Sequence, residues 1–409
     1  MRPLKLAEGI YDVGVKDWNI RDFHGYSTHM GTSYNAFIIV GSQKTVLIDT
    51  VKEPFVNQFM ENISKIIDPK EIDILVSNHA EMDHSGALPR ILHQIGADKP
   101  VYCSKMGERA LSAHFPTRQI NYQVVKPGTD ISLGNYTLSF IETRMLHWPD
   151  SMFTFIKEAG ILFSSDAFGQ HYAWHENFDD EMGEGLFHHA KKYFANILLP
   201  YAGKVEKLLK SMEEMDLDIK MICPDHGILW RKNPREIIRR YGRWARHQSK
   251  EKVIVIYDTM WNSTEKMAKE IVDGARSTGV EVIPMSVRNW HRSDIMTELI
   301  DARALMVGSP TLNNGIFPTL CDVLCYMKGL KPQKKLGAAF GSYGWSGEAV
   351  KLLNKELDDM GFERLDDGLK TLYVPDKDQL TAAYDMGVRM GEAVKAKSNP
   401  TEEISPPLL

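Results

Sequence analysis

The chain has 409 residues, more than one hydrophobic core usually holds, and this length predicts two domains. Its 49 basic and 54 acidic residues give a net charge of −5, so the overall charge shows no sign of nucleic-acid binding. A hydrophobic fraction of 43% indicates a globular protein. No apolar run reaches the ~18–20 residues that span a bilayer. The four cysteines show no CxxC spacing and no secretory leader is visible, so we expect a cytoplasmic protein without disulfides or a zinc ribbon.

Strands and helices alternate from the start of the chain. Two strands around a polar turn are predicted within residues 37–50, and a helix is expected to open at Pro54. A short buried strand then ends at Asn78 and leads directly into the sequence HAEMDHS. Ligand-binding residues in α/β folds collect at strand ends, so this junction is a candidate site.

The junction carries four groups that can bind metal, followed by Ser85 as a predicted helix start. Alternate residues of an extended segment point the same way, so His79, Glu81 and Asp83 are expected to converge while His84 faces a neighbouring spot. Imidazole mixed with carboxylate is the ligand chemistry of iron, manganese or zinc. A polar loop that caps a helix through Ser85 is the alternative, but four such groups without a basic partner favour a metal.

Three further candidate ligands lie in the same situation, each directly after an apolar run. His147 follows LSFIETRML, Asp166 follows GILFSS and His226 follows IKMICPD. Taken alone, each has an ordinary explanation, a loop histidine or a turn cap. The repetition at four strand ends is more informative than any one of them.

The order HxExDH, then His, Asp and His, resembles the metallo-β-lactamase superfamily in its diiron branch, and most closely the flavodiiron proteins. Zinc hydrolases of that superfamily carry HxHxDH, whereas Glu81 adds one negative charge and one oxygen donor. A carboxylate-rich ligand set suits redox iron, although zinc and manganese also bind such groups.

The resemblance implies two irons held by seven side chains, three for each iron and one as a bridge. The first iron would be held by His79, Glu81 and His147, the second by Asp83, His84 and His226, and the bridge would be Asp166.

The resemblance also places a histidine and a tyrosine over the open face of the metals, where they could donate hydrogen bonds to bound oxygen species. His24 and Tyr193 match these positions best, and a half-buried core tyrosine is the alternative for Tyr193. The His- and aromatic-rich segment 169–181 is interpreted as a loop near the site whose histidines lie at the surface and bind no metal.

The second half of the chain shows a regular alternation of strands and helices after a basic segment at 235–252. We interpret this segment as a solvated helix that leads into a linker, and a contact for an acidic electron donor is the alternative. The alternation predicts five parallel strands covered on both faces, in the flavodoxin-like order that binds FMN. For residues 1–250, the resemblance to flavodiiron proteins implies a metallo-β-lactamase-like αββα sandwich. A flavodoxin-like doubly wound parallel sheet would follow over 251–397, with a flexible tail at 398–409.

Three loops at strand ends of this second domain are predicted to bind the flavin. The first, TMWNSTE, offers hydroxyls and free backbone N–H groups at a helix start, which suits a phosphate. An ordinary helix cap is the alternative, and a P-loop is excluded because GK[ST] is absent. Glycines in the other loops let the backbone approach a flat ring, on which aromatic side chains could stack. The predicted flavin-binding residues are Thr259, Met260, Trp261, Asn262, Ser263, Thr264, Pro310, Thr311, Leu312, Asn313, Asn314, Ser342, Tyr343, Gly344, Trp345, Ser346 and Gly347.

Together the two domains imply an oxidoreductase that reduces dioxygen to water or nitric oxide to nitrous oxide. Rubredoxin or a reduced deazaflavin would supply electrons through FMN. The family brings the FMN of one chain to the metals of another, so we expect a head-to-tail homodimer or a dimer of such dimers. Alternatives are a zinc-dependent hydrolase with a flavodoxin-like regulatory domain, and a flavin-based electron carrier with a vestigial metal domain. Neither nucleic acid nor a membrane is an expected partner.

Overall fold

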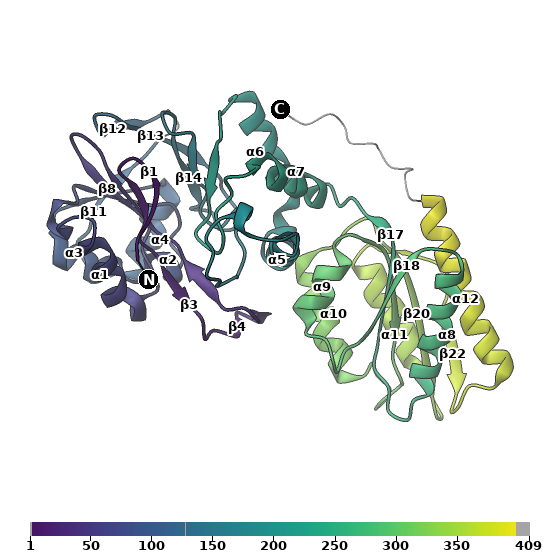
Figure 1. The fold of residues 1–409 in the computed structure, drawn as a ribbon. Coiled ribbons are helices and arrows are strands. Elements are labelled where there is room, and N and C mark those ends of the chain that lie inside the picture. Colours follow the sequence, from purple (N-terminus) through teal and green to yellow (C-terminus); the bar gives the residue numbers. More distant parts are fainter. Residues whose placement is uncertain (1, 127, 398–409) are drawn as a thin grey trace.

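The computed structural model describes residues 2–126 and 128–397, so the predicted tail at 398–409 lies outside the described residues. Figure 1 shows two units side by side, joined where helix α7 (Pro234–Ala245) leads into strand β17 (Lys250–Tyr257). No helix within the described part of the chain has the length and apolar character needed to cross a membrane.

The first unit is built from two β-sheets packed face to face. The first sheet has seven strands in the order β1 (Leu4–Ala7), β2 (Ile10–Asp12), β7 (Phe37–Val40), β8 (Thr45–Ile48), β9 (Ile74–Ser77), β10 (Pro100–Cys103) and β11 (Asn121–Val124). The second has five strands in the order β12 (Asp130–Ser132), β13 (Thr137–Glu142), β14 (Met152–Ile156), β15 (Ile161–Phe163) and β16 (Met221–Cys223). A buried apolar cluster fills the space between the two sheets.

Helices cover the outer face of each sheet, which completes the αββα sandwich. The first sheet is covered by α1 (Val56–Ser64), α3 (Leu88–Ile95) and α4 (Lys105–His114), and the second by α5 (Leu186–Tyr193), α6 (Ala202–Glu214) and α7. The sequence of α3 explains its placement, because the buried residues fall at helical spacing and form one apolar stripe. They are Leu88, Ile91, Leu92 and Ile95.

The segment after β9 differs from the sequence-based expectation. Glu81 has an extended backbone, but a short helix, α2 (Met82–Ser85), begins immediately after it rather than at Ser85. Because a helix turns by about 100° per residue, Asp83 does not point the way of His79 and Glu81. The expectation that these three residues converge on one spot is therefore wrong.

The second unit is a parallel sheet with helices on both faces. Its order is β18 (Glu281–Ser286), β17, β19 (Ala302–Gly308), β20 (Leu336–Tyr343) and β21 (Glu363–Arg364), and β22 (Leu369–Leu372) also pairs with β20. This order agrees with the predicted flavodoxin-like sheet, with one difference. The fifth strand is split into two short strands that share one edge of β20.

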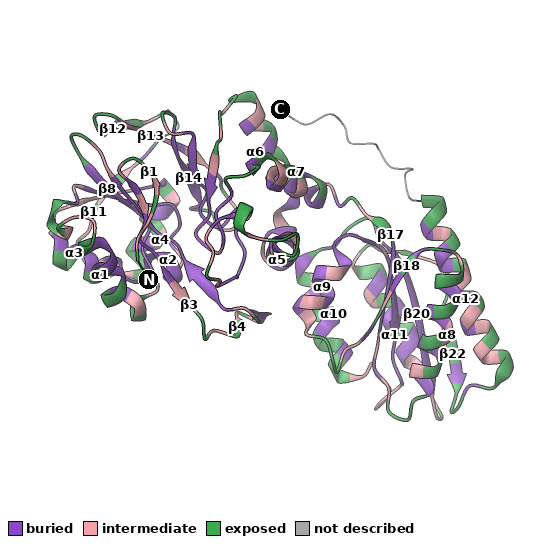
Figure 2. Cartoon of the chain, in the orientation of Figure 1, coloured by how far each residue is buried: buried purple, intermediate pink, exposed green. Residues whose placement is uncertain are grey.

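The helices of the second unit form two layers with different neighbours. One face is covered by α8 (Ser263–Ser277) and α12 (Lys377–Lys397), and the other by α9 (Arg292–Leu299), α10 (Pro318–Leu330) and α11 (Glu348–Asp359). Figure 2 shows the consequence, with mostly buried strands between helices that expose their outer sides. The layer that contains α9 shares one continuous buried cluster with α5 and α7, so the two units pack through an apolar interface.

Candidate metal centre

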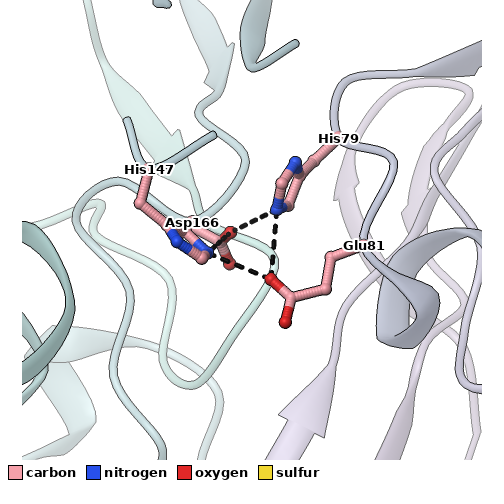
Figure 3. A group of neighbouring side chains, drawn as sticks. All are labelled: His79, Glu81, His147 and Asp166. Atoms are coloured by element: carbon pink, nitrogen blue, oxygen red, sulfur yellow. Dashed lines mark hydrogen bonds and ion pairs between the residues drawn. The ribbon is translucent and has the colours of Figure 1, made fainter. Parts of the chain in front are cut away.

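The structure brings all seven predicted ligands together as two adjacent groups. In each group, one possible ligand atom per residue lies within 4.8 Å of the others. Figure 3 shows the first group converging from separate loops. The first group is His79, Glu81, His147 and Asp166, and the second is Asp83, His84 and His226.

The Asp166 carboxylate lies between the two groups and turns one oxygen to each. Its Oδ2 lies 3.4 Å from Nε2 of His79 and 3.3 Å from Nε2 of His147. Its Oδ1 lies 3.3 Å from Nε2 of His84 and 3.3 Å from Nε2 of His226. One carboxylate facing two sets of imidazole nitrogens is the arrangement expected of a ligand that bridges two metal ions.

Several polar atoms of the centre are buried without a hydrogen-bond partner. They include both carboxylate oxygens of Asp83, both ring nitrogens of His84 and Oδ2 of Asp166. Buried polar atoms are normally paired, because an unpaired group loses its hydration without compensation. Bound cations would satisfy these atoms, so the side chains fit the pair of metal ions that the sequence implies.

The protonation equilibria of the protein without metal support the same interpretation. Burial opposes the charged imidazolium of His79, but Asp150, Glu81 and Asp166 raise its pKa well above the ordinary value. Burial likewise opposes the charge of Asp166, yet His84, His147 and His79 hold the pKa of that carboxyl well below its usual range. The negative carboxylates therefore favour positive charge beside them. Without metal, protons on the histidines provide this charge, and bound cations would replace those protons.

Residues behind the ligands fix the orientation of the imidazole rings. Nδ1 of His79 donates to Oδ2 of Asp150 over 3.1 Å, and the same oxygen accepts the backbone N–H of Ala80 over 2.6 Å. Nδ1 of His226 donates to the Ser33 carbonyl over 2.7 Å. Each bond directs Nε2 of its ring toward the centre. Sequence reasoning missed Asp150, although its position three residues after His147 is a usable signal.

The two residues predicted to lie over the metals occupy different environments. Nε2 of His24 lies 3.5 Å from Oε1 of Glu81, and the His24 side chain is 77% exposed. Tyr193 is fully buried, and its hydroxyl donates to Oδ1 of Asp166 over 2.9 Å. Burial and the neighbouring Asp166 raise the pKa of Tyr193 well above the usual value, so the hydroxyl keeps the proton that it donates. Tyr193 is therefore a buried partner of Asp166, not a half-buried core residue.

One histidine of the 169–181 loop lies at the centre, contrary to the expectation that its histidines are surface residues. The His171 ring is buried 4.7 Å from the His226 ring and 5.1 Å from the Tyr193 ring. A hydrogen bond of 2.9 Å joins its Nδ1 to Oγ1 of Thr32. Burial, together with the nearby His226, lowers the pKa of His171 well below its usual range and keeps the ring neutral. His175 is exposed, as expected.

The three predicted flavin loops meet at one end of the second unit. Oγ of Ser342 lies 2.9 Å from Oγ1 of Thr264, and the carbonyl oxygen of Ser342 accepts the N–H of Thr311 over 2.9 Å. Ser346 Oγ donates to Oδ1 of Asn314 over 3.3 Å. Each loop region is thus hydrogen-bonded to another, although the three are far apart in sequence.

This end of the unit has the polar and aromatic groups that a flavin phosphate and ring require. Helix α8 opens there after Asn262, and Oγ1 of Thr259 is buried without a hydrogen-bond partner. Trp261 and Trp345 are 88% and 89% exposed, which is unusual for such large apolar rings. Tyr373, which the sequence analysis does not single out, is 62% exposed at the same end, and its N–H donates to the Tyr343 carbonyl.

We expect Asp166→Asn to reduce the metal content of the purified protein from two ions per chain to one or none. The amide removes a charge that two cations share. Metal analysis by mass spectrometry checks this, with Asp12→Asn as a control. Asp12 is also a buried aspartate, but its carboxylate accepts the Gly14 N–H and lies in neither group. An unchanged metal content in Asp166→Asn would contradict the bridging role.

Asp150→Asn should weaken metal binding roughly 10–100-fold, the range found when an outer partner of a ligating histidine is changed. The ring of His79 loses its charged acceptor, while the side chain keeps its shape. Competition with a chelator measures the affinity. Equal affinities of Asp150→Asn and the unmodified protein would show that this contact does not orient His79.

Comparison with known proteins agrees with both units. Residues 32–227 match the family described as ODP family beta lactamase, and residues 255–387 match the flavodoxin family. The chain is 45% identical to a nitric oxide reductase from Moorella thermoacetica, over 96% of this chain and 99% of that protein.

Two solved structures extend the likeness to three dimensions. Rubredoxin oxygen:oxidoreductase from Desulfovibrio gigas superposes with a TM-score of 0.94 at 41% identity, covering 97% of this chain and 99% of that one. The flavodiiron protein from Giardia intestinalis superposes with a TM-score of 0.93 at 33% identity, covering 97% of each chain. The chain belongs to the flavodiiron protein family.

Proposed function

We propose that this chain reduces dioxygen to water or nitric oxide to nitrous oxide at a pair of irons, with electrons delivered through FMN. The observation that carries the proposal is the Asp166 carboxylate, whose two oxygens face two separate groups of ligands. The names of similar proteins, a nitric oxide reductase and a rubredoxin oxygen:oxidoreductase, support the same activity.

The cofactors account for the number of electrons that each reaction needs. Bound FMN and two irons together supply four electrons, enough to reduce one dioxygen to two waters, while two electrons convert two nitric oxides to nitrous oxide and one water. Protons must accompany them, four in the first reaction and two in the second.

The side chains of the centre would hold the metals and balance their charge. Glu81, Asp83 and Asp166 offset most of the charge of two divalent cations, while the histidines add neutral donors. Tyr193 fixes Asp166 through its hydroxyl. The ring of Phe23 lies 4.8 Å from that of His171 and forms an apolar wall beside the ligands. Polar interactions among such buried groups are stronger than in water.

We also propose a head-to-tail dimer, in which the flavin of one chain lies over the metals of another. Figure 1 shows the loops after β17, β19 and β20 at the lower end of the second unit, while the ligand groups belong to the first. Large apolar side chains are exposed at that end, including Trp261, Trp345, Tyr373 and Val374. A patch of this kind favours burial against a partner chain.

The cytoplasmic location stays a prediction, and so does rubredoxin or a reduced deazaflavin as the electron donor.

The direct test of the activity mixes anaerobically reduced protein with each gas in a stopped-flow instrument. We expect rapid reoxidation by at least one gas, with water rather than peroxide from dioxygen, or nitrous oxide from nitric oxide. Metal analysis should find two irons per chain. Two zincs without iron, together with no consumption of either gas, would contradict the proposal and favour the hydrolase.

Co-expression of two inactive variants tests the dimer. Asp166→Asn removes the shared metal ligand, and Thr264→Val with Ser342→Ala removes hydroxyls from the flavin loops. A head-to-tail dimer of one chain of each kind pairs intact flavin loops with intact metal ligands, so gas reduction should reappear. Each variant expressed alone is the control. Failure of the co-expressed pair, when both chains are shown to associate, would contradict the arrangement.

A further inference from the structure

We infer that helix α9 of the flavodoxin-like unit clamps the hairpin that carries His24, and that Arg292 and Ser293 are positioning residues for the metal centre. The inference rests on the proposed function, because the place of His24 matters only if chemistry occurs beside Glu81. In addition to binding the flavin, the second unit would then fix the position of the hairpin that borders the metal site of its own chain.

The hairpin joins β4 (Asp22–Phe23) to β5 (Tyr26–Ser27) through a two-residue turn. The turn residues, His24 and Gly25, have φ angles of 54° and 83°, the left-handed conformation that tight hairpins require. The turn brings Nε2 of His24 to 3.5 Å from Oε1 of Glu81. The adjacent Phe23 ring lies 6.3 Å from the ring of His226, a ligand of the second group. The hairpin thus borders both ligand groups.

Such a short hairpin needs support from outside itself. An isolated two-stranded hairpin is marginally stable in water even when its strands are longer. Helix α9 forms hydrogen bonds with the hairpin at the turn and at the last residue of β5. Nε of Arg292 donates to the Gly25 carbonyl over 3.3 Å, and the N–H of Ser27 donates to Oγ of Ser293 over 3.2 Å. The hydroxyls of Ser27 and Ser293 are also hydrogen-bonded at 2.8 Å.

Charged groups reinforce these contacts from two sides. Nζ of the buried Lys192 donates to Oγ of Ser27 over 2.7 Å and to Oδ1 of Asp294 over 2.5 Å. Arg292 is itself fixed, because Nη1 donates to Oδ1 of Asp322 over 2.6 Å. Hydrogen bonds that involve charged groups are stronger and more directional than neutral ones. The clamp therefore resists small displacements of the hairpin.

The clamp can hold the hairpin because buried side chains anchor α9 in the interface between the two units. Ile295, Met296 and Leu299 are fully buried in the apolar cluster that spans both units. Arg292 packs closely against the turn, since a Cβ added at Gly25 would lie 2.7 Å from Nη2 of Arg292. The position of His24 over Glu81 thus follows the position of the flavodoxin-like unit.

Hydrogen exchange tests the clamp without reference to activity. In the flavin- and metal-loaded full chain, Arg292→Ala should speed deuterium uptake by residues 22–28 roughly tenfold, because local opening needs less free energy. Arg292→Lys, which keeps a donor for the Gly25 carbonyl, should restore much of the protection. Lys191→Ala is the matched control, since Lys191 joins the same two units through Asp301, 3.4 Å away, without touching the hairpin. Unchanged uptake in Arg292→Ala would overturn the inference.

A double-mutant cycle tests whether Arg292 acts through His24. Arg292→Ala should lower kcat for gas reduction roughly tenfold, as expected of a small misplacement, while KM for the electron donor stays unchanged. In a His24→Ala background the same change should have less than roughly twofold effect. Equal losses in both backgrounds would overturn the positioning role. Absence of gas reduction in the unmodified protein would instead defeat the proposed function, and the exchange experiment would still decide whether the clamp exists.

Discussion

The buried carboxylate of Asp166 is the interaction on which the metal-binding unit depends. Its two oxygens lie 3.3–3.4 Å from four imidazole nitrogens, which arrive from loops of both sheets. Burying this carboxylate with Glu81 and Asp83 beside it costs free energy, and nearby positive charge is needed to offset that cost. The αββα sandwich makes this concentration possible, because strand ends of two facing sheets open onto one edge and their loops need not disturb the core.

The ligands could be predicted from sequence because each follows a buried strand, where the local pattern is strong. The strand order of the second unit was predicted for the same reason, since long apolar strands alternate with amphipathic helices. The convergence of His79, Glu81 and Asp83 was predicted wrongly, because the chain turns into helix α2 at Met82. Local alternation of residue types does not reveal where an extended segment becomes a helix.

Residues that support the ligands without binding metal were harder to predict than the ligands. Asp150 and Ser33 support the rings of His79 and His226 from distant segments, and only Asp150 lies close in sequence to a predicted ligand, three residues after His147. The sequence predicts His171 at the surface because histidines without an evident partner usually lie there, yet its ring is buried against His226. The role of α9 was equally hidden. A helix in one unit supports a hairpin in the other, and only the packing of the two units shows it.

The central prediction is that two irons lie on either side of Asp166. Anomalous X-ray scattering from crystals of the purified protein, recorded on both sides of the iron absorption edge, tests it most directly. We predict two iron peaks per chain, one beside His79, Glu81 and His147 and the other beside Asp83, His84 and His226, each in contact with one oxygen of Asp166. A single peak, or peaks that appear only at the zinc edge, would contradict the account.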